Sequence, residues 1–386
     1  MSGDGRWAGW LDAALASLDA VSLRRTRLPV EPVDAVHVRV DGVPVTLFSG
    51  NDYLGLSAHP EVRKAASEAA LAHGMGPRGS ALICGYTDAH AALEGELARL
   101  KGTEAAVLTP TGFAANLCVL QALAGEDVAI FSDALNHASI VDGCRLAARS
   151  GAQVHIYRHG DVAHLEELLR GCAMERRVIV TDSVFSMDGD LAPLQSLVDV
   201  KHRYGAWLVV DDAHGTLVHG ATGAGVAEHL GVSADVDVHI GTLSKAVGAL
   251  GGFIAASQSW CDWCVNRGRA QVYSTALPLP VVAAARAALR VAAVEPEHRE
   301  RLWGHVARVG DALERSCESP IIAWVVGSPE RALSVSRSLL DLGLHATAIR
   351  PPTVPEGTSR LRLTLSAAHA SSDIDTLTAS VARLRS

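Results

Sequence analysis

The sequence predicts an α/β protein with a large domain built on a mainly parallel sheet, followed by a smaller α+β domain. From about residue 60, short apolar strands alternate with helical segments, for example AAVLT before FAANLCVLQAL and DVAIFSD before HASIVDGCRLAA. Short apolar strands separated by helices are typical of a parallel sheet covered on both faces. The chain has 386 residues, which is more than one hydrophobic core usually supports. We therefore expect two domains.

The N-terminal part of the chain has a different pattern. It begins with a segment typical of a short amphipathic helix. Residues 36–48, VHVRVDGVPVTLF, then alternate apolar and other residues on both sides of Asp41-Gly42, which predicts a β-hairpin. Neither element has a place in the strand–helix run, so we expect both to pack with the second domain.

The strand–helix run continues through the middle of the chain, with the further strands QVHIY, RVIVT, WLVVDDAHG, VDVHIGT and GGFIAAS. Beyond residue 280, an Ala- and Arg-rich helical stretch leads to IIAWVV, a helix over 330–342, LHATAIR, RLRLTL and a final helix. We expect the N-terminal helix and hairpin at 1–50, the large α/β domain at 51–285 and the small domain at 286–386.

Composition excludes several classes of protein. The net charge is −8 and Lys and Arg are scattered, which argues against a nucleic-acid surface. No apolar run approaches the roughly 18 residues that span a bilayer, and the N-terminus lacks the features of a signal peptide. The seven cysteines form no disulfide-like framework, which fits a reducing cytoplasm. We interpret Cys261-Asp-Trp-Cys264 as packing residues on a helix rather than as a redox pair.

Residues that could carry chemistry follow the carboxyl ends of the predicted strands, where ligands bind in open α/β sheets. Lys245 is the most unusual of them, because lysine is rarely left at the end of a buried strand without a partner. Five strand ends carry such groups: Gly112 and Phe113; His137; Ser186; Asp211, Asp212 and His214; and Thr242, Ser244 and Lys245.

Taken singly, these residues have simpler explanations. Gly112-Phe113 can be only a turn before a helix, His137 a structural histidine, and Lys245 a side chain that reaches the surface. The Asp-Asp-Ala-His segment at 211–214 could cap a helix or bind a metal, but no H-E-x-x-H or second carboxylate cluster supports a metal. We assign no metal to this site, and the combination of residues favours an organic cofactor.

Pyridoxal phosphate accounts for the whole set, because it carries an aldehyde, a phosphate, a pyridine nitrogen and a flat ring. Lys245 would supply the amine of the Schiff base. Asp211 would keep the pyridine nitrogen protonated, so that the ring can accept electrons. The backbone N–H groups of Gly112 and Phe113, at a helix N-terminus, would bind the phosphate.

Four further side chains complete the predicted site. The hydroxyls of Thr242 and Ser186 could join the phosphate contacts. His214 could hydrogen-bond the phenolic oxygen, and His137 could stack over the ring. Competing sites lack their motifs: the sequence has no G-x-x-x-x-G-K-[ST], no G-x-S-x-G, and no G-x-G-x-x-G in a dinucleotide-binding context.

Along almost its whole length the sequence resembles the α-oxoamine synthases, pyridoxal-phosphate enzymes of the aspartate-aminotransferase fold (fold type I). The matching segments are SGNDYLGLSAHP (49–60), TPTGFAANLCVLQAL (109–123), SDALNHASIVDGCRLA (132–147), TDSVFSMDGDLAPL (181–194), VVDDAHGTLVHGATGAG (209–225), GTLSKAVGALGG (241–252), YSTALP (273–278) and RPPTVPEGTSRLRLTLSAAH (350–369). The first and last are most similar to family members of biotin biosynthesis. This resemblance implies condensation of L-alanine with a pimeloyl thioester, releasing CO₂ and the free thiol.

The resemblance also implies roles for individual residues. It supports the cofactor roles given above for Lys245, Asp211, His214, His137, Gly112, Phe113, Ser186 and Thr242. Thr275, in YSTALP, matches a phosphate contact made from the neighbouring subunit, which implies a homodimer with shared active sites.

For the substrates, the resemblance implies that Arg350 holds the amino-acid carboxylate with Thr353 nearby, and it places Asn51 and His137 among the substrate contacts. An arginine in LRRTRLPV would face the acyl substrate. We assign this role to Arg25, with Arg24 as the alternative.

Two other functions remain open. A sister α-oxoamine synthase that uses glycine and acetyl-CoA would share these motifs. A non-catalytic regulator that binds pyridoxal phosphate would usually carry an added DNA-binding module, for which 386 residues leave no room. The sequence also leaves open whether the acyl carrier is coenzyme A or a carrier protein.

Overall fold

A computed structural model describes residues 4–385 of the chain, which form two compact units. The larger unit consists of Asn51–Ser186 and Asp190–Trp303. The smaller unit holds the described residues before Asn51, the short stretch Met187–Gly189 and the residues from Gly304 onward.

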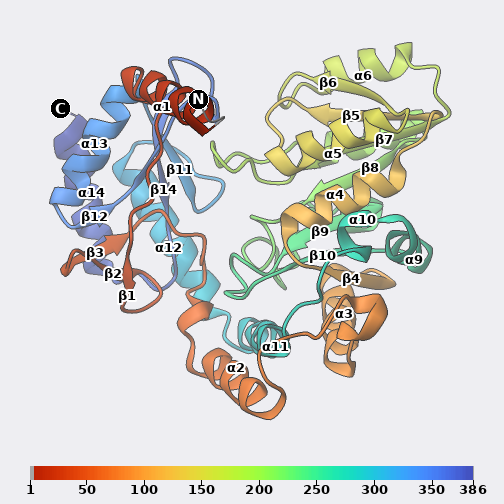
Figure 1. Ribbon diagram of the computed structural model, residues 1–386, viewed down its shortest axis with the longest axis horizontal. Helices are drawn as coiled ribbons and strands as arrows, with labels where there is room; N and C mark the ends of the chain where they lie inside the picture. The colour runs from red at the N-terminus through yellow and green to blue at the C-terminus, as the bar shows by residue number, and fades with distance from the viewer. Residues whose placement is uncertain (1–3, 386) are drawn as a thin grey trace. The chain divides into compact units, whose positions relative to one another are not determined.

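The larger unit is built on a seven-stranded sheet with the strand order β4-β10-β9-β8-β7-β5-β6 (Figure 1). The strands are β4 (Ala105–Thr109), β5 (Val128–Asp133), β6 (Gln153–Tyr157), β7 (Arg176–Asp182), β8 (Trp207–Asp211), β9 (Val238–Thr242) and β10 (Gly252–Ala256). Only β10 runs antiparallel to its neighbours β4 and β9 among these strands; the others pair in parallel. The mainly parallel sheet predicted from the sequence is therefore present.

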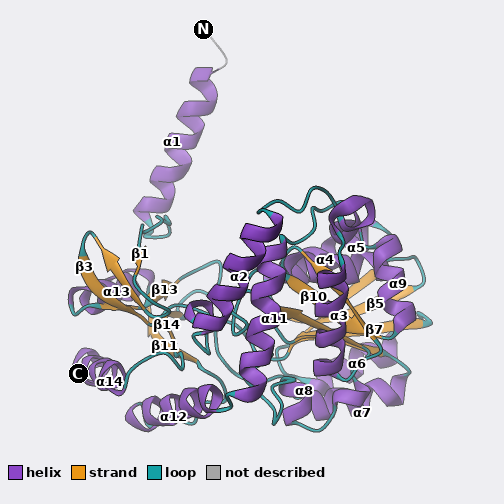
Figure 2. Ribbon diagram, turned by 90° about the horizontal axis from the view of Figure 1, so that it is seen from below, coloured by secondary structure: helices purple, strands orange, loops and turns teal. Residues whose placement is uncertain are grey.

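Helices lie on both faces of this sheet (Figure 2), which is why its central strands are apolar on both sides. The helices of the larger unit are α2 (Pro60–His73), α3 (Asp88–Lys101), α4 (Gly112–Leu123), α5 (Ala138–Arg149), α6 (Val162–Gly171), α7 (Leu194–Tyr204), α8 (Val226–His229), α9 (Gln258–Arg267), α10 (Arg269–Val272) and α11 (Leu279–Val294). The C-x-x-C residues Cys261 and Cys264 on α9 are buried in the core. Burial raises the pKa of the Cys261 thiol to about 12, so its position fits packing better than redox chemistry.

The smaller unit contains two sheets. One has the order β1-β2-β3-β12 and the other β11-β14-β13. The elements are α1 (Asp4–Ala20), β1 (Glu31–Pro32), β2 (His37–Val40), β3 (Val43–Leu47), β11 (Ile321–Gly327), α13 (Pro329–Asp341), β12 (Leu344–His345), β13 (Thr347–Ile349), β14 (Ser359–Thr364) and α14 (Ser371–Arg385). The hairpin β2–β3 turns at Asp41-Gly42, where both residues have positive φ, 50° and 79°.

The N-terminal hairpin shares a sheet with a C-terminal strand, because β12 pairs in parallel with β3. The end of the larger unit differs from the boundary at residue 285 that we expected from the sequence. Residue 285 lies inside α11, which packs against α2 and α3 of the larger unit. The chain passes to the smaller unit only after Trp303, inside α12 (Glu297–Ala312). Among the described residues, no helix combines the length and apolar character needed to cross a membrane.

Candidate active site

Lys245 lies in a tight turn that follows β9. The buried strand ends at Thr242, whose hydroxyl accepts the N–H of Ser244 at 3.1 Å and donates to the carbonyl of Gly251 at 2.8 Å. The N–H of Gly248 donates to the carbonyl of Lys245 at 2.8 Å. Gly248 has φ 70°, and a Cβ there would lie 2.4 Å from the backbone nitrogen of Ser57. A larger residue would therefore displace the turn that holds Lys245.

A chain of hydrogen bonds starts at the Lys245 amine. Nζ lies 2.8 Å from Nε2 of His214, and Nδ1 of His214 lies 2.6 Å from the hydroxyl of Tyr53. The Tyr53 hydroxyl in turn donates to Oδ1 of Asn51 at 3.2 Å. One arrangement gives every contact a donor and an acceptor: Lys245 donates to Nε2, Nδ1–H donates to Tyr53, and Tyr53 donates to Asn51.

A second chain joins Asp211 to His137. Oδ2 of Asp211 accepts from Nδ2 of Asn116 at 2.6 Å, and the same amide nitrogen donates to the hydroxyl of Ser139 at 2.9 Å. The Ser139 hydroxyl lies 2.7 Å from Nδ1 of His137. Nδ1 also accepts the backbone N–H of Ser139 at 3.3 Å, so it carries no proton; the Ser139 hydroxyl therefore donates to it, and the His137 proton is on Nε2. Asp211, Asn116 and Ser139 are buried, so this part of the chain is shielded from water, while His137 at its other end is exposed.

Electrostatics around this second chain are set by burial and by neighbouring charges. Burial lowers the pKa of His137; the negative charge of Asp211 opposes this, and the charge of Lys245 adds to it. Asp182 is the register partner of Asp211 on the neighbouring strand. Burial raises the pKa of Asp182 well above its usual range, and the charge of Asp211 raises it further. These shifts favour neutral forms of His137 and Asp182 beside Asp211.

The start of α4 provides a place for a phosphate. Thr111 caps this helix by accepting the N–H of Ala114 at 3.0 Å. Gly112 and Phe113 come next, in the first turn, where helix geometry supplies no carbonyl partner for the backbone N–H groups. A Cβ on Gly112 would lie 3.2 Å from Cβ of Thr242, so glycine keeps space open beside this hydroxyl. The donors present thus fit the phosphate of the predicted cofactor.

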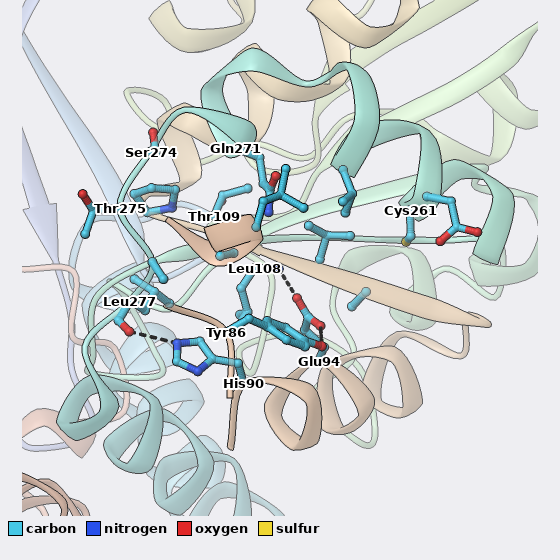
Figure 3. A pocket seen from close by; sticks show the side chains of 18 of the residues that line it. Tyr86, His90, Glu94, Leu108, Thr109, Cys261, Gln271, Ser274, Thr275 and Leu277 are labelled. Carbon is cyan, nitrogen blue, oxygen red and sulfur yellow. Dashed lines mark hydrogen bonds between the residues drawn. The ribbon is translucent and has the colours of Figure 1, made fainter. Parts of the chain in front are cut away.

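The other three predicted cofactor contacts are Phe113, Ser186 and Thr275. Phe113 is partly exposed, with its ring edge-to-face to His137 at 6.3 Å. Ser186 lies in the loop after β7. Thr275 pairs with Ser80 in an isolated β-bridge. It also lines a pocket of about 310 Å³ (Figure 3), which includes Tyr86, His90, Glu94, Thr109 and Pro110.

The predicted substrate residues of the smaller unit come together around a cavity of about 670 Å³. Nη2 of Arg25 donates to the hydroxyl of Thr353 at 3.0 Å. The guanidinium of Arg350 donates to the carbonyls of Ser22 and Arg24. Partial burial lowers the pKa of Arg350, and the nearby charge of Arg25 adds to this. Four arginines, Arg24, Arg25, Arg337 and Arg350, line this cavity against one carboxylate, Asp19, which makes it a suitable place for an anionic group.

Asp212, one of the strand-end residues, has a structural role. Its Oδ2 accepts from Nζ of Lys101 at 2.6 Å, and its Oδ1 accepts from the hydroxyl of Ser183 at 2.6 Å. Lys101 also donates to the hydroxyl of Thr216 and the carbonyl of Ala224. Since all three ammonium donors are used, the buried ion pair is satisfied.

The sequence analysis did not identify Tyr53, Asn116 and Ser139, which belong to the two series of hydrogen bonds, or Asp182, which lies beside Asp211. Asp182 is the last residue of β7, so the strand-end rule would have included it. Asn116 follows Gly112 by one helical turn, which places both on one face of α4. No comparable sequence signal marks Tyr53.

The fold and the site define a pyridoxal-phosphate-dependent transferase of fold type I. The family model described as aminotransferase class I and II matches residues 43–381. An 8-amino-7-oxononanoate synthase of Anaeromyxobacter dehalogenans is 48% identical, covering 97% of this chain and 94% of that protein. One of Arabidopsis thaliana is 53% identical, covering 86% and 73%. The chain belongs to the aminotransferase class I and II family and, within it, to the α-oxoamine synthases, which are acyltransferases.

Solved structures agree with this assignment. A serine palmitoyltransferase of Sphingomonas wittichii superposes with a TM-score of 0.92 at 31% identity, covering 100% of this chain and 98% of that one. An 8-amino-7-oxononanoate synthase of Francisella tularensis gives a TM-score of 0.75 at 24% identity, over 88% and 96%, and so supports the fold. The fold class and the cofactor predicted from the sequence are confirmed.

Proposed function

We propose that the protein condenses L-alanine with a pimeloyl thioester to give 8-amino-7-oxononanoate, CO₂ and a free thiol, in biotin biosynthesis. A bond forms between Cα of alanine and the thioester carbonyl carbon, the C–S bond breaks, and the alanine carboxylate leaves as CO₂. The curated relatives cited above carry the name of this product. The observation that carries the proposal is the placement of two hydrogen-bonded chains, one starting at Lys245 and one at Asp211, at the ends of the neighbouring strands β9 and β8.

Bound pyridoxal phosphate supplies an electron-accepting ring that stabilises negative charge developing at Cα. Lys245 would carry the cofactor and, once its amine is free, would remove and return the proton at Cα. A positioned base of this kind is typically worth about 10²–10⁴-fold in rate. Asp211, held by Asn116, would keep the pyridine nitrogen protonated, because a buried carboxylate favours a proton on its partner.

The other predicted residues would bind and orient the groups. His214 would contact the phenolic oxygen, and His137 would cover the ring with its Nε2–H available to the substrate. The first turn of α4, together with the hydroxyls of Thr242 and Ser186, would bind the phosphate.

Arg350 would bind the alanine carboxylate through two parallel hydrogen bonds, with Thr353 beside it. Arg25 and Asn51 would contact the acyl substrate and the amino acid. In support, Arg25, Arg350 and Thr353 line one cavity, and Asn51 accepts from Tyr53 in the series of hydrogen bonds that starts at Lys245.

The same proposal includes a cytoplasmic homodimer, in which the partner's Thr275 would contact the phosphate. If so, Thr275→Val should weaken cofactor retention while leaving the dimer intact. Sedimentation velocity and the visible absorbance of the holoenzyme would measure these two properties separately.

Mass spectrometry of the product formed by the holoenzyme from L-alanine and pimeloyl-CoA tests the reaction. We expect a nine-carbon amino ketone and one CO₂ per thiol released, and pimeloyl-carrier protein assayed in parallel identifies the preferred carrier. Turnover with glycine and acetyl-CoA alone would instead identify a 2-amino-3-ketobutyrate CoA ligase. Bound cofactor without acyl transfer from any of these donors would indicate a regulator.

A further inference from the structure

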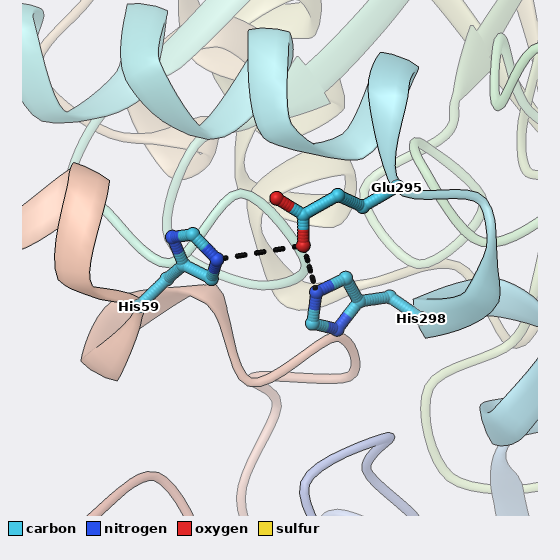
Figure 4. A group of neighbouring side chains, drawn as sticks. All are labelled: His59, Glu295 and His298. Carbon is cyan, nitrogen blue, oxygen red and sulfur yellow. Dashed lines mark hydrogen bonds and ion pairs between the residues drawn. The ribbon is translucent and has the colours of Figure 1, made fainter.

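Three side chains of the larger unit, none of them used above, bring two imidazoles and one carboxylate together (Figure 4). Nε2 of His59 lies 3.5 Å from Oε2 of Glu295, and Nε2 of His298 lies 3.2 Å from the same oxygen. All three atoms lie within 4.8 Å of one another. We propose that His59, Glu295 and His298 form a binding site for a divalent transition-metal ion, and that zinc is the ion that fits this site best.

The distances suit zinc. Zinc binds histidine nitrogen and carboxylate oxygen at about 2.0–2.2 Å, so the ligand atoms of a tetrahedral site lie about 3.3 Å apart. The two distances to Glu295 already have this size. Only the two imidazoles need to approach each other, and their rings are already in edge-to-face contact with centroids 5.9 Å apart. Two histidines and one glutamate leave a fourth position for water, as in other three-ligand zinc sites.

The three ligands are carried by helix ends, which limits their freedom. His59 is the N-cap of α2 and precedes Pro60, and Glu295 is the C-cap of α11. His298 lies in the first turn of α12, just beyond Pro296. Because α2 packs along α11, the first two ligands are held by one helix pair.

The hydrogen bonds of the two histidines set the cost of metal binding. Nδ1 of His298 is buried without a hydrogen-bond partner among residues 4–385. Nδ1 of His59 accepts the N–H of Glu61 at 3.3 Å, so the proton of this ring is on Nε2. Zinc on Nε2 would move that proton to Nδ1 and remove this long cap bond. The carboxylate and the C-terminus of α11 favour a cation, whereas the N-termini of α2 and α12, which carry His59 and His298, oppose it. We therefore expect weaker binding than at a buried four-ligand structural site.

Calorimetric titration of the tag-free holoenzyme with zinc chloride tests the site. We expect one zinc per chain, with affinity reduced more than about tenfold in both His298→Gln and Glu295→Gln, since losing even an outer-shell partner typically costs 10–100-fold. His73→Gln is the matched control, because His73 is exposed at the other end of α2. X-ray absorption should show only nitrogen and oxygen ligands at about 2.0–2.1 Å.

Thermal unfolding gives an independent measurement. Zinc should raise the melting temperature of the parent protein and of His73→Gln, but not of the two ligand variants, because only the folded site binds it. Equal visible absorbance of the bound cofactor in all variants shows that the fold is intact. Absence of saturable binding, or equal binding in the parent and both ligand variants, would overturn the proposal. Neither result would affect the proposed condensation, since the three residues have no part in it.

Discussion

The strand-end site of the larger unit and the arginine cavity of the smaller unit are built in different ways. In the strand-end site, Asp211 and Asn116 are 5% and 1% exposed, and they are joined by a 2.6 Å hydrogen bond. In the arginine cavity, Arg25 is exposed and Arg350 contacts main-chain carbonyls of a segment without regular structure. The first arrangement fixes a few atoms relative to one another, while the second presents charge on an open surface.

This difference has a kinetic consequence. Groups that act on the reacting atoms change the rate of the chemical step, whereas groups that bind remote parts of a substrate change its affinity. We therefore expect substitutions in the strand-end site to lower kcat and those in the arginine cavity to raise KM.

Lys245→Ala should have the largest effect, because it removes both the attachment of the cofactor and the base at Cα. We expect kcat to fall by at least about 10²–10⁴-fold, measured as product formation and as exchange of the alanine α-proton with solvent. Lys64→Ala on the exposed face of α2 is the control and should retain activity. Borohydride treatment of the parent holoenzyme should fix the cofactor on the peptide that contains Lys245; label on another lysine would contradict the assignment.

Arg350→Ala should weaken alanine binding by about 2–3 kcal/mol, in the upper part of the range for hydrogen bonds to charged groups. The visible absorbance of the bound cofactor should be unchanged, because Arg350 is assigned to binding the substrate and not the cofactor. Spectral titration with L-alanine measures the dissociation constant. Arg337→Ala is a matched control, since this exposed arginine lines the same cavity without an assigned role. Equal effects of the two substitutions would show that the cavity acts only through its total charge.

Asn116→Leu should lower kcat about tenfold or more and leave KM for alanine nearly unchanged. The substitution keeps the size of the side chain but removes the donor to Asp211, and a hydrogen bond to a charged group is worth about 1.5–3 kcal/mol. Exchange of the alanine α-proton with solvent measures removal of the proton at Cα directly. Gln121→Leu, further along the same helix, controls for the loss of a buried amide. A rise in KM with unchanged kcat would mean that Asn116 does not position Asp211.

The strand-end site could be predicted largely because parallel strands end at one edge of a sheet. Asp211 is the last residue of β8, and His214 and Lys245 come within three residues after β8 and β9, so their proximity follows from topology alone. The residues that orient them could not be found in the same way. Asn116 and Ser139 lie on helices, and their hydrogen bonds depend on how α4 and α5 pack.

The residues of the arginine cavity could be predicted only from the resemblance of the sequence to a known family. Arg25 follows α1 in a segment without regular structure, and Arg350 follows a short strand more than three hundred residues later. No periodicity brings such segments together, because their contact depends on the packing of the whole unit. For the same reason, the end of the larger unit was placed too early. The Ala-rich α11 has no composition break at residue 285, and its contacts with α2 keep it in the larger unit.

His159→Gln should have the smallest effect, and on stability rather than activity. His159 lies at the same sheet edge as the strand-end site, with Nδ1 3.0 Å from Asp133 and Nε2 2.8 Å from Asp190. Its hydrogen bonds to Asp133 and then Asp190 raise the pKa of His159 to about 10, above its usual 6.5. A raised pKa in the folded state means that the stabilisation is complete below about pH 6.5 and is lost as the pH rises through about 10. The melting temperature of His159→Gln should therefore lie below that of the parent by roughly 2–4 °C at pH 6, as about 1 kcal/mol gives in a unit of this size. The difference should shrink steadily toward pH 10, with His73→Gln matching the parent throughout. A difference that is constant across this range would mean that His159 acts through its edge-to-face contact with Phe185 and not through its charge.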